Sequence, residues 1–288
     1  MRPDNLSVPV LVPRSVDEVC AALDADHDAV LVAGGTDLMV GVNAGRQSLT
    51  SVITLDRVDA LRAWRRDGDQ LILGAGLTYT DLADPELAEM VPALAQAART
   101  VGSPQIRNAG TIGGNLATAS PAGDTLPVLA ALGAGVLVQS SSGGRTIALA
   151  DFCVGPKHTA LSPGELIVGV TVPVLDGPQE FLKVGTRNAM VISVASAAVV
   201  ADLAGRRIGV GLGSVGPTVL RAPQAESWVL DHIDWESRSL PDPRTPGTFG
   251  DLVARAARPI DDHRSTAEYR RHCVGVLAQR ALLRMFPA

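Results

Sequence analysis

The sequence predicts an α+β fold made of two domains. A length of 288 residues suits two domains of ordinary size. Strand and helix patterns alternate along the first part of the chain, whereas the last third shows a strand hairpin followed by helices. Turn-forming residues gather at 173–178, so we place the boundary between residues 1–175 and 176–288. The first domain divides further into lobes of about residues 1–57 and 58–175.

The first lobe is predicted to hold short strands and one helix. Ser15 and Glu18 form a capping box, and the helix that follows continues to about Asp26. Three short apolar segments are predicted strands, the second of them buried: residues 8–12, 29–33 and 51–55.

The second lobe is predicted to combine helices with a sheet. Predicted helices cover residues 85–101 and 125–132, and Pro85 occupies a first-turn position that tolerates proline. Gly110 to Gly114 is predicted to be a glycine-rich loop, and residues 140–144 a turn. Apolar runs predict three strands, at residues 71–73, 136–138 and 166–172.

The second domain begins with strands and ends with helices. The turn residues 204–206 separate predicted strands at 191–203 and 207–212, which indicates an antiparallel hairpin, and 180–184 is a third strand. Ser265 and Glu268 have the spacing of another capping box. The predicted helices are residues 225–230, 249–257 and 266–286.

Composition excludes several classes of protein. A net charge of −5 argues against a broadly basic nucleic-acid surface, so we expect no nucleic-acid partner. The three cysteines are far apart, which excludes a zinc ribbon, a disulfide scaffold and an iron–sulfur cluster held by this chain. No apolar run approaches the roughly 20 residues of a membrane span. We therefore expect a cytoplasmic protein without a transmembrane segment.

Two glycine pairs are candidate ligand-binding segments, and the first is Gly34-Gly35. It follows the predicted strand 29–33 and precedes small polar residues. Glycines let a ligand approach the main chain closely, and consecutive amides in such a turn can bind an anion. A tight turn between two strands explains this segment equally well, and on these residues alone both interpretations stand.

The second pair, Gly113-Gly114, lies between Thr111 and Asn115. Neither segment contains Lys or Arg, so a bound diphosphate would be neutralised by backbone N–H groups and helix dipoles. Asp124 follows closely. Capping the helix that begins at Thr125 is the simplest role for its side chain, and accepting hydrogen bonds from ligand hydroxyls is the alternative.

Other cofactor and metal motifs are absent from the sequence. Gly211 to Gly216 matches GxGxxG, but residues 217–220 are predicted to be extended, whereas a dinucleotide fingerprint opens a helix there. No GxxxxGK[ST] or GxSxG sequence occurs. The five histidines lack paired metal spacing, so we predict no metal ligands.

The two glycine segments resemble those of the FAD-binding subunits of molybdenum hydroxylases. This family includes the carbon monoxide dehydrogenase medium subunit and the xanthine dehydrogenase flavin domain. The strongest similarity covers residues 105–115 (Gln-Ile-Arg-Asn-Ala-Gly-Thr-Ile-Gly-Gly-Asn) and continues through 119–124. Residues 262–272 also resemble the closing helix of the family, and the similarity runs through nearly the whole chain.

The resemblance implies a two-lobed FAD-binding domain (PCMH-type, vanillyl-alcohol-oxidase-like), then a domain with a three-stranded antiparallel sheet and helices. It implies an FAD-containing oxidoreductase subunit that passes electrons from partner iron–sulfur clusters to an external acceptor such as NAD, a quinone or oxygen. A small subunit would carry the [2Fe-2S] clusters and a large subunit the molybdenum cofactor, in a dimer of heterotrimers. The chemistry would belong to the cofactor, so no catalytic side chain is assigned.

The same resemblance places cofactor-binding residues in both glycine segments and beyond them. Lys183 near the flavin ring would stabilise negative charge on the reduced flavin, and a strand-edge lysine in solvent is the alternative. The implied cofactor-binding residues are Leu31, Val32, Ala33, Gly34, Gly35, Thr36, Asp37, Leu38, Val101, Thr111, Ile112, Gly113, Gly114, Asn115, Thr118, Asp124, Ile167 and Lys183.

Two other functions remain open at this point. A stand-alone FAD-dependent oxidoreductase of the same fold would reduce its flavin with substrate and without partners. A non-catalytic assembly protein that retains the fold would bind no flavin.

Overall fold

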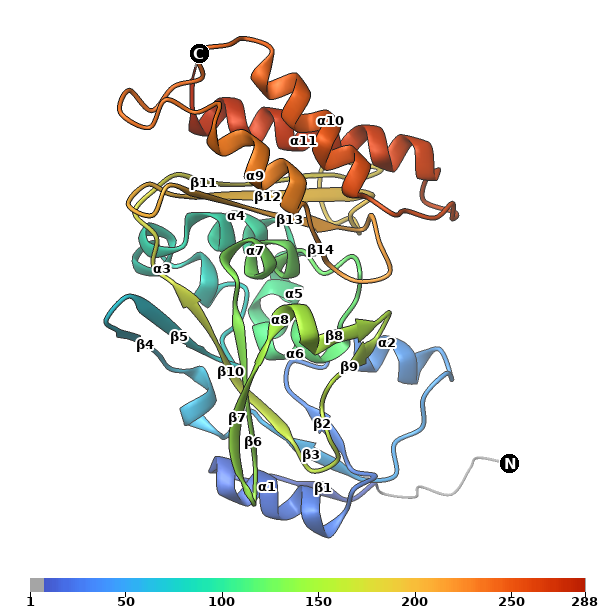
Figure 1. Ribbon diagram of the computed structural model, residues 1–288. Coiled ribbons are helices and arrows are strands. Elements are labelled where there is room, and N and C mark those ends of the chain that lie inside the picture. Colours follow the sequence, from blue (N-terminus) through green and yellow to red (C-terminus); the bar gives the residue numbers. More distant parts are fainter. Residues whose placement is uncertain (1–7, 288) are drawn as a thin grey trace.

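The computed structural model describes residues 8–287, in which two lobes are followed by a helix-covered sheet (Figure 1). The first lobe holds a three-stranded parallel sheet in the order β1-β3-β2, and Val52 pairs with both Val10 and Val30. Its elements are β1 (Val10–Leu11), α1 (Val16–Ala25), β2 (Val30–Val32), α2 (Leu38–Asn43) and β3 (Val52–Thr54).

The predicted helix and the three predicted strands of this lobe are confirmed, the burial predicted for one strand is corrected, and one of the two open interpretations of Gly34-Gly35 is excluded. The helix α1 begins after Ser15, whose hydroxyl accepts the N–H of Glu18. The predicted strands β1 and β3 form as well. The strand β2 is half-buried rather than buried, because it borders the crevice described below. The segment after Gly34-Gly35 enters α2, so it is not a turn between two strands.

The second lobe is built on a five-stranded antiparallel sheet in the order β4-β5-β10-β6-β7. Its strands are β4 (Trp64–Asp67), β5 (Gln70–Gly74), β6 (Gly135–Ser140), β7 (Gly143–Ala148) and β10 (Leu166–Pro173), with a separate small pair, β8 (Cys153–Gly155) and β9 (His158–Thr159). Its helical elements are η1 (Asp59–Arg62), η2 (Asp81–Ala83), α3 (Pro85–Met90), α4 (Pro92–Thr100), α5 (Pro104–Ala109), α6 (Ile112–Thr118), α7 (Thr125–Leu132) and α8 (Leu149–Phe152).

Proline and threonine explain where this lobe departs from the prediction. The expected helix 85–101 is divided at Val91, because Pro92 has no N–H to continue it and starts α4 instead. The expected loop Gly110 to Gly114 contains the start of α6, since the Thr111 hydroxyl accepts the N–H of Gly114 and caps the helix. The helix α7 has the predicted bounds.

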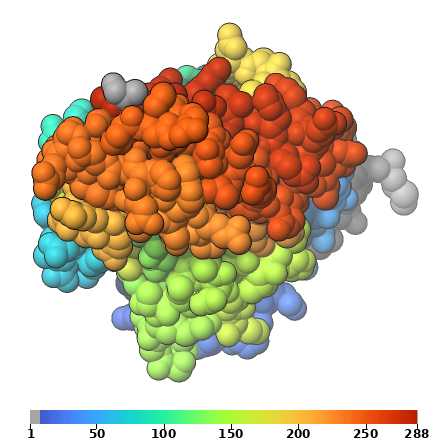
Figure 2. All heavy atoms as spheres, turned by 45° about the horizontal axis from the view of Figure 1, so that its top comes forward, coloured from blue at the N-terminus to red at the C-terminus, as the bar shows by residue number. Residues whose placement is uncertain are grey.

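The third unit is an antiparallel sheet in the order β11-β12-β13-β14, with four strands where three were expected, because the two residues of β14 pair with the outer edge of β13. Helices α9 to α11 cover one face, and α4 and α7 lie against the other (Figure 1). Figure 2 shows the three C-terminal helices covering a broad face of the molecule. The elements are β11 (Gln179–Val184), β12 (Ala195–Asp202), β13 (Arg207–Gly213), β14 (Leu220–Arg221), α9 (Pro223–Leu230), α10 (Thr245–Ala256) and α11 (Ala267–Met285).

The predicted hairpin is confirmed, because β12 and β13 pair from Asp202 with Arg207 onward. The strand predicted at 191–203 begins only at Ala195, and just before it the Ser193 hydroxyl donates to Asp124 of the second lobe. The helix α11 is capped by Thr266, whose hydroxyl accepts the N–H of Tyr269, so the predicted Ser265 cap is one residue early. No helix among residues 8–287 is long and apolar enough to cross a membrane.

Candidate functional site

The two glycine segments face each other across one crevice between the lobes. A cavity of about 680 Å³ is lined on one side by Leu31 to Leu38. Thr111, Gly114, Asn115 and Thr118 line it on the other side. This volume lies within the range of about 300–1,000 Å³ typical of sites for small molecules and cofactors. The structure therefore brings together segments that are separated by some seventy positions in the sequence.

The lobes meet closely at the first glycine. A Cβ atom on Gly34 would lie 1.7 Å from the carbonyl oxygen of Ala109, so only glycine fits there. The φ angle of Gly35 is +66°, in the left-handed region that glycine adopts easily. Gly34 therefore allows the close contact between the lobes, and Gly35 allows the chain to turn.

The backbone after Gly34 offers unpaired donors to the cavity. No protein acceptor in the described part of the chain receives the N–H of any residue from Gly34 to Leu38. All of these residues line the cavity. Successive N–H groups around a left-handed residue form a concave site for anions. The anion-binding interpretation of Gly34-Gly35 is therefore the one that the geometry favours.

The second glycine segment contributes no such backbone donors. The N–H groups of Ile112 and Gly113 donate to the carbonyls of Leu77 (2.9 Å) and Ala75 (2.8 Å). The N–H of Gly114 donates to its own helix cap, Thr111 Oγ1, at 3.0 Å. The N–H groups of these three residues are therefore not available to a ligand, whereas the side chains on this side of the crevice are.

Asn115 is one of these side chains. Its Oδ1 accepts a hydrogen bond from Thr125 Oγ1 at 2.6 Å. The Nδ2 group has no protein acceptor in the described chain, and the residue lines the cavity. Asn115 is therefore oriented by α7 and has a donor left for a ligand.

A lysine that neither glycine segment contains supplies positive charge. Lys157 lies between β8 and β9, is exposed and lines the same cavity. Its backbone N–H donates to the carbonyl of Ala119 at 3.2 Å, which ties this turn to the end of α6. The expectation that backbone groups and helix dipoles alone would neutralise a diphosphate is thus incomplete.

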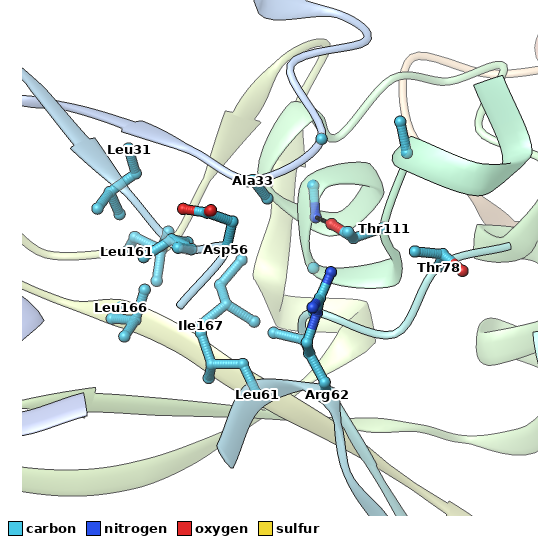
Figure 3. Close-up of a pocket in the computed structure, with 18 of the residues that line it drawn as sticks. Leu31, Ala33, Asp56, Leu61, Arg62, Thr78, Thr111, Leu161, Leu166 and Ile167 are labelled. Carbon is cyan, nitrogen blue, oxygen red and sulfur yellow. Dashed lines mark hydrogen bonds between the residues drawn. The ribbon is translucent and has the colours of Figure 1, made fainter. Parts of the chain in front are cut away.

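One end of the crevice is apolar. A pocket of about 240 Å³ shares Leu31, Gly34 and Thr111 with the main cavity. Figure 3 shows Leu31, Leu161, Leu166 and Ile167 together on one side of this pocket, opposite Thr78 and Thr111. Asp56 and Arg62 add charged groups to its lining.

The other end of the crevice carries a buried ion pair. Lys183 Nζ lies 2.6 Å from Asp124 Oδ2, and Ser193 Oγ donates to Asp124 Oδ1 at 2.5 Å. The same ammonium also donates to the carbonyls of Thr100 (3.2 Å) and Val191 (3.3 Å). Protein acceptors therefore use all three ammonium hydrogens of Lys183, which is neither in solvent nor free to reach a ligand.

Asp124 does not cap α7 with its side chain, so the capping interpretation is wrong. Burial raises the pKa of Asp124 above its usual value, while the ammonium of Lys183 and its hydrogen bond act in the opposite direction. Asp124 lines a pocket of about 200 Å³ that shares Val101, Asn115 and Gly123 with the main cavity. Val101 lies at the end of α4.

Tyr79 is the aromatic side chain at this junction. It lines both the main cavity and the pocket beside Asp124, and it is 6% exposed. Burial, and then the carboxylates of Asp124 and Asp37, raise the pKa of its phenol, which keeps it protonated. Nothing near Tyr79 in the sequence marks it as a site residue.

The structure groups the predicted site residues unequally. Those lining the main cavity are Leu31, Val32, Ala33, Gly34, Gly35, Thr36, Asp37, Leu38, Val101, Thr111, Gly114, Asn115 and Thr118. Gly113 and Ile167 line the apolar pocket, and Ile112 is buried behind the crevice. Ile167 lines the apolar pocket, whereas Asp124, which pairs with Lys183, lines the pocket at the other end. These two pockets share no lining residue, and the main cavity lies between them.

Several further residues line the crevice without having been predicted as site residues. Those from segments without a local motif reach it only through tertiary packing: Gln47, Tyr79, Lys157 and Ile192. The others lie in or between the segments 105–115 and 119–124 that carry the family resemblance: Ile106, Ala117, Ser120, Ala122 and Gly123. No group of three or more His, Cys, Asp or Glu side chains in residues 8–287 is arranged to hold a metal ion.

Comparison with known proteins finds related chains along nearly the whole length. Residues 5–175 match the family "FAD binding domain in molybdopterin dehydrogenase", and residues 180–285 match "CO dehydrogenase flavoprotein C-terminal domain". The glyceraldehyde dehydrogenase medium chain of Sulfolobus acidocaldarius is 31% identical, over 93% of this chain and 94% of its own.

Two further similarities agree with these matches. The nicotine 6-hydroxylase medium subunit of Paenarthrobacter nicotinovorans is 33% identical, with 94% of each chain covered. A chain in the structure of reconstituted CO dehydrogenase from Oligotropha carboxidovorans superposes with a TM-score of 0.87 at 29% identity, covering 97% of both chains.

Proposed function

Because the chain belongs to the family of FAD-binding subunits of molybdenum hydroxylases, we propose that it holds FAD and passes electrons from a partner subunit to an external acceptor. When bound, FAD accepts and donates the electrons, while the protein supplies binding, orientation and charge. The observation that carries this proposal is the row of unpaired N–H groups from Gly34 to Leu38 along a cavity of about 680 Å³.

The residues present fit this cofactor. The diphosphate would lie against Gly34 to Leu38, with Lys157 as the counter-charge. The apolar pocket around Leu161 and Ile167 suits the adenine. The opposite end, with Tyr79 and the ion pair of Asp124 and Lys183, would hold the flavin ring, where a fixed charge pair can tune a redox centre.

We extend the proposal to the rest of the complex. A small subunit would supply iron–sulfur clusters and a large subunit the molybdenum cofactor, in a dimer of heterotrimers. The names "medium chain" and "medium subunit" of the relatives support an assembly of several chains. The cysteines of this chain are each buried and unpaired, in keeping with clusters held elsewhere.

The purified chain, reconstituted with FAD, should retain one flavin and show flavin absorption. A small aromatic substrate alone should not bleach that absorption, whereas the addition of the reduced partner subunits should. Failure to retain FAD would favour the assembly-protein function. Bleaching by substrate without any partner would favour a stand-alone oxidoreductase.

The Lys157→Gln variant should bind FAD about two- to fivefold more weakly, because an exposed charge contact contributes about 0.4–1 kcal/mol. The loss should shrink at high salt, which screens that contact in the parent chain. Titration of FAD fluorescence at two ionic strengths measures both effects. Arg206→Gln is the matched control, because Arg206 is also exposed with a left-handed backbone but lies in the turn between β12 and β13. Equal affinities for the two variants would remove Lys157 from the site.

A further inference from the structure

The GxGxxG segment at Gly211 to Gly216 packs against the second lobe. A Cβ atom on Gly211 would lie 1.8 Å from the carbonyl oxygen of Pro127, so β13 touches α7 directly. Ser214 follows β13 with a φ of +61°, and its N–H donates to the carbonyl of Pro121 at 2.7 Å. The third unit is thereby hydrogen-bonded to the turn 119–124.

That turn carries part of the crevice wall. Ser120, Ala122 and Gly123 line the main cavity, and Asp124 follows at the end with the ion pair. Pro121, which does not line the cavity, accepts the hydrogen bond from Ser214 through its carbonyl oxygen. A change in the position of Ser214 would therefore move a wall of the cavity without touching any residue that lines it.

Arg270 holds Ser214 from the other side. Its side chain, on α11, is 3% exposed. Nη1 donates to the carbonyl oxygen of Ser214 at 2.9 Å, and Nη2 donates to Asp262 Oδ1 at 2.5 Å. Asp262 supplies the negative charge that a buried guanidinium requires, and its Oδ2 also binds Arg264 at 2.7 Å. A left-handed backbone is unfavourable for serine, so Ser214 depends on these contacts.

We propose that Arg270 is a positioning residue for the cofactor: through Ser214 and Pro121 it sets the turn 119–124 that forms a wall of the FAD crevice. The inference rests on the proposed function, because it takes the crevice as the FAD site. Two hydrogen bonds in sequence make this connection. The Arg270 guanidinium donates to the carbonyl oxygen of Ser214, and the N–H of Ser214 donates to the carbonyl oxygen of Pro121.

The test compares Arg270→Gln with Arg264→Gln in the full chain. Arg264 also binds Asp262, but it has no hydrogen bond to Ser214. Two quantities are measured: the dissociation constant for FAD, and the rate of amide hydrogen exchange at Ser214 in the cofactor-free protein. We expect Arg270→Gln to weaken FAD binding about tenfold and to speed exchange at Ser214 by a similar factor, as the loss of a charge-assisted hydrogen bond should. Arg264→Gln should change either quantity by less than about threefold.

A variant Arg270→Gln with a lower melting temperature but parental FAD affinity and Ser214 exchange would overturn the proposal, since Arg270 would then only stabilise the fold. If this variant does not fold, Arg270→Lys replaces it, because one ammonium keeps the charge beside Asp262 but cannot reproduce the two-pronged contact. A parent chain that binds no FAD would defeat the proposed function instead. The exchange rate at Ser214 needs no cofactor, and it would still decide whether Arg270 holds this residue.

Discussion

The Gly114→Val variant should lose FAD while it keeps its fold. Gly114 lies in α6 and lines both the main cavity and the apolar pocket. Apart from its chain neighbours and the backbone of its own helix, the described chain brings only Thr111 Oγ1 within 4 Å of a Cβ atom built there, at 3.1 Å, so the new side chain would project into the space of the cofactor. In a helix, valine is no worse than glycine, and therefore the free energy of unfolding should change by less than about 1 kcal/mol.

The matched control is Gly247→Val. Gly247 is also helical, in α10, and apart from its chain neighbours and its own helix backbone the described chain places no atom within 4 Å of its Cβ position. Both variants are passed through gel filtration with FAD, and the flavin retained and the cofactor-free melting temperature are measured. Normal FAD retention by Gly114→Val would show that the second glycine segment has been misassigned.

The Asp124→Asn variant should lose about 3–5 kcal/mol of stability even without FAD, because it leaves the ammonium of Lys183 buried without its counter-charge. The side chain of Lys183 is only 11% exposed, so water cannot replace the carboxylate. The family resemblance, which places Asp124 at the cofactor, would by itself predict that FAD retention suffers more than stability. The ion pair changes that expectation, since stability should now fall strongly in the cofactor-free chain.

Urea unfolding of the cofactor-free protein measures this loss, with Asp242→Asn as the control. Asp242 pairs with Arg244 in solvent, and such a pair contributes at most about 1 kcal/mol. The double variant Asp124→Asn with Lys183→Met removes both charges and should recover much of the stability. If Asp124→Asn cost no more than Asp242→Asn, the two charges would not be paired in solution.

Local chemistry accounts for the parts of the fold that were predicted from sequence. The Ser15 cap, the turn between β12 and β13, and the uniformly apolar helix α7 all depend on neighbours in the chain. A loop was expected at Gly113-Gly114 because glycine has low helix propensity. The prediction was wrong because the Thr111 cap and the packing around α6 outweigh that propensity.

The site was predictable only where it lies in a contiguous motif. The two glycine segments and Asn115 were found in this way. The partner of Asp124 is 59 positions away, and Lys157 approaches the crevice only because β8 and β9 fold back toward α6. A single sequence does not encode such distances in any local pattern, and so the roles of Asp124 and Lys183 had to come from the structure.

The ion pair at the end of the crevice joins the two family matches. Asp124 falls within the segment 5–175 and Lys183 within 180–285, and the helix after Asp124 is buried beneath the third sheet along its whole length. The two modules that sequence families recognise separately are therefore not independent parts of this molecule. The segment 5–175 that matches the FAD-binding family ends before Lys183 and Ile192, which complete the end of its crevice. The boundary between the two sequence families therefore does not coincide with a boundary between independent structural units.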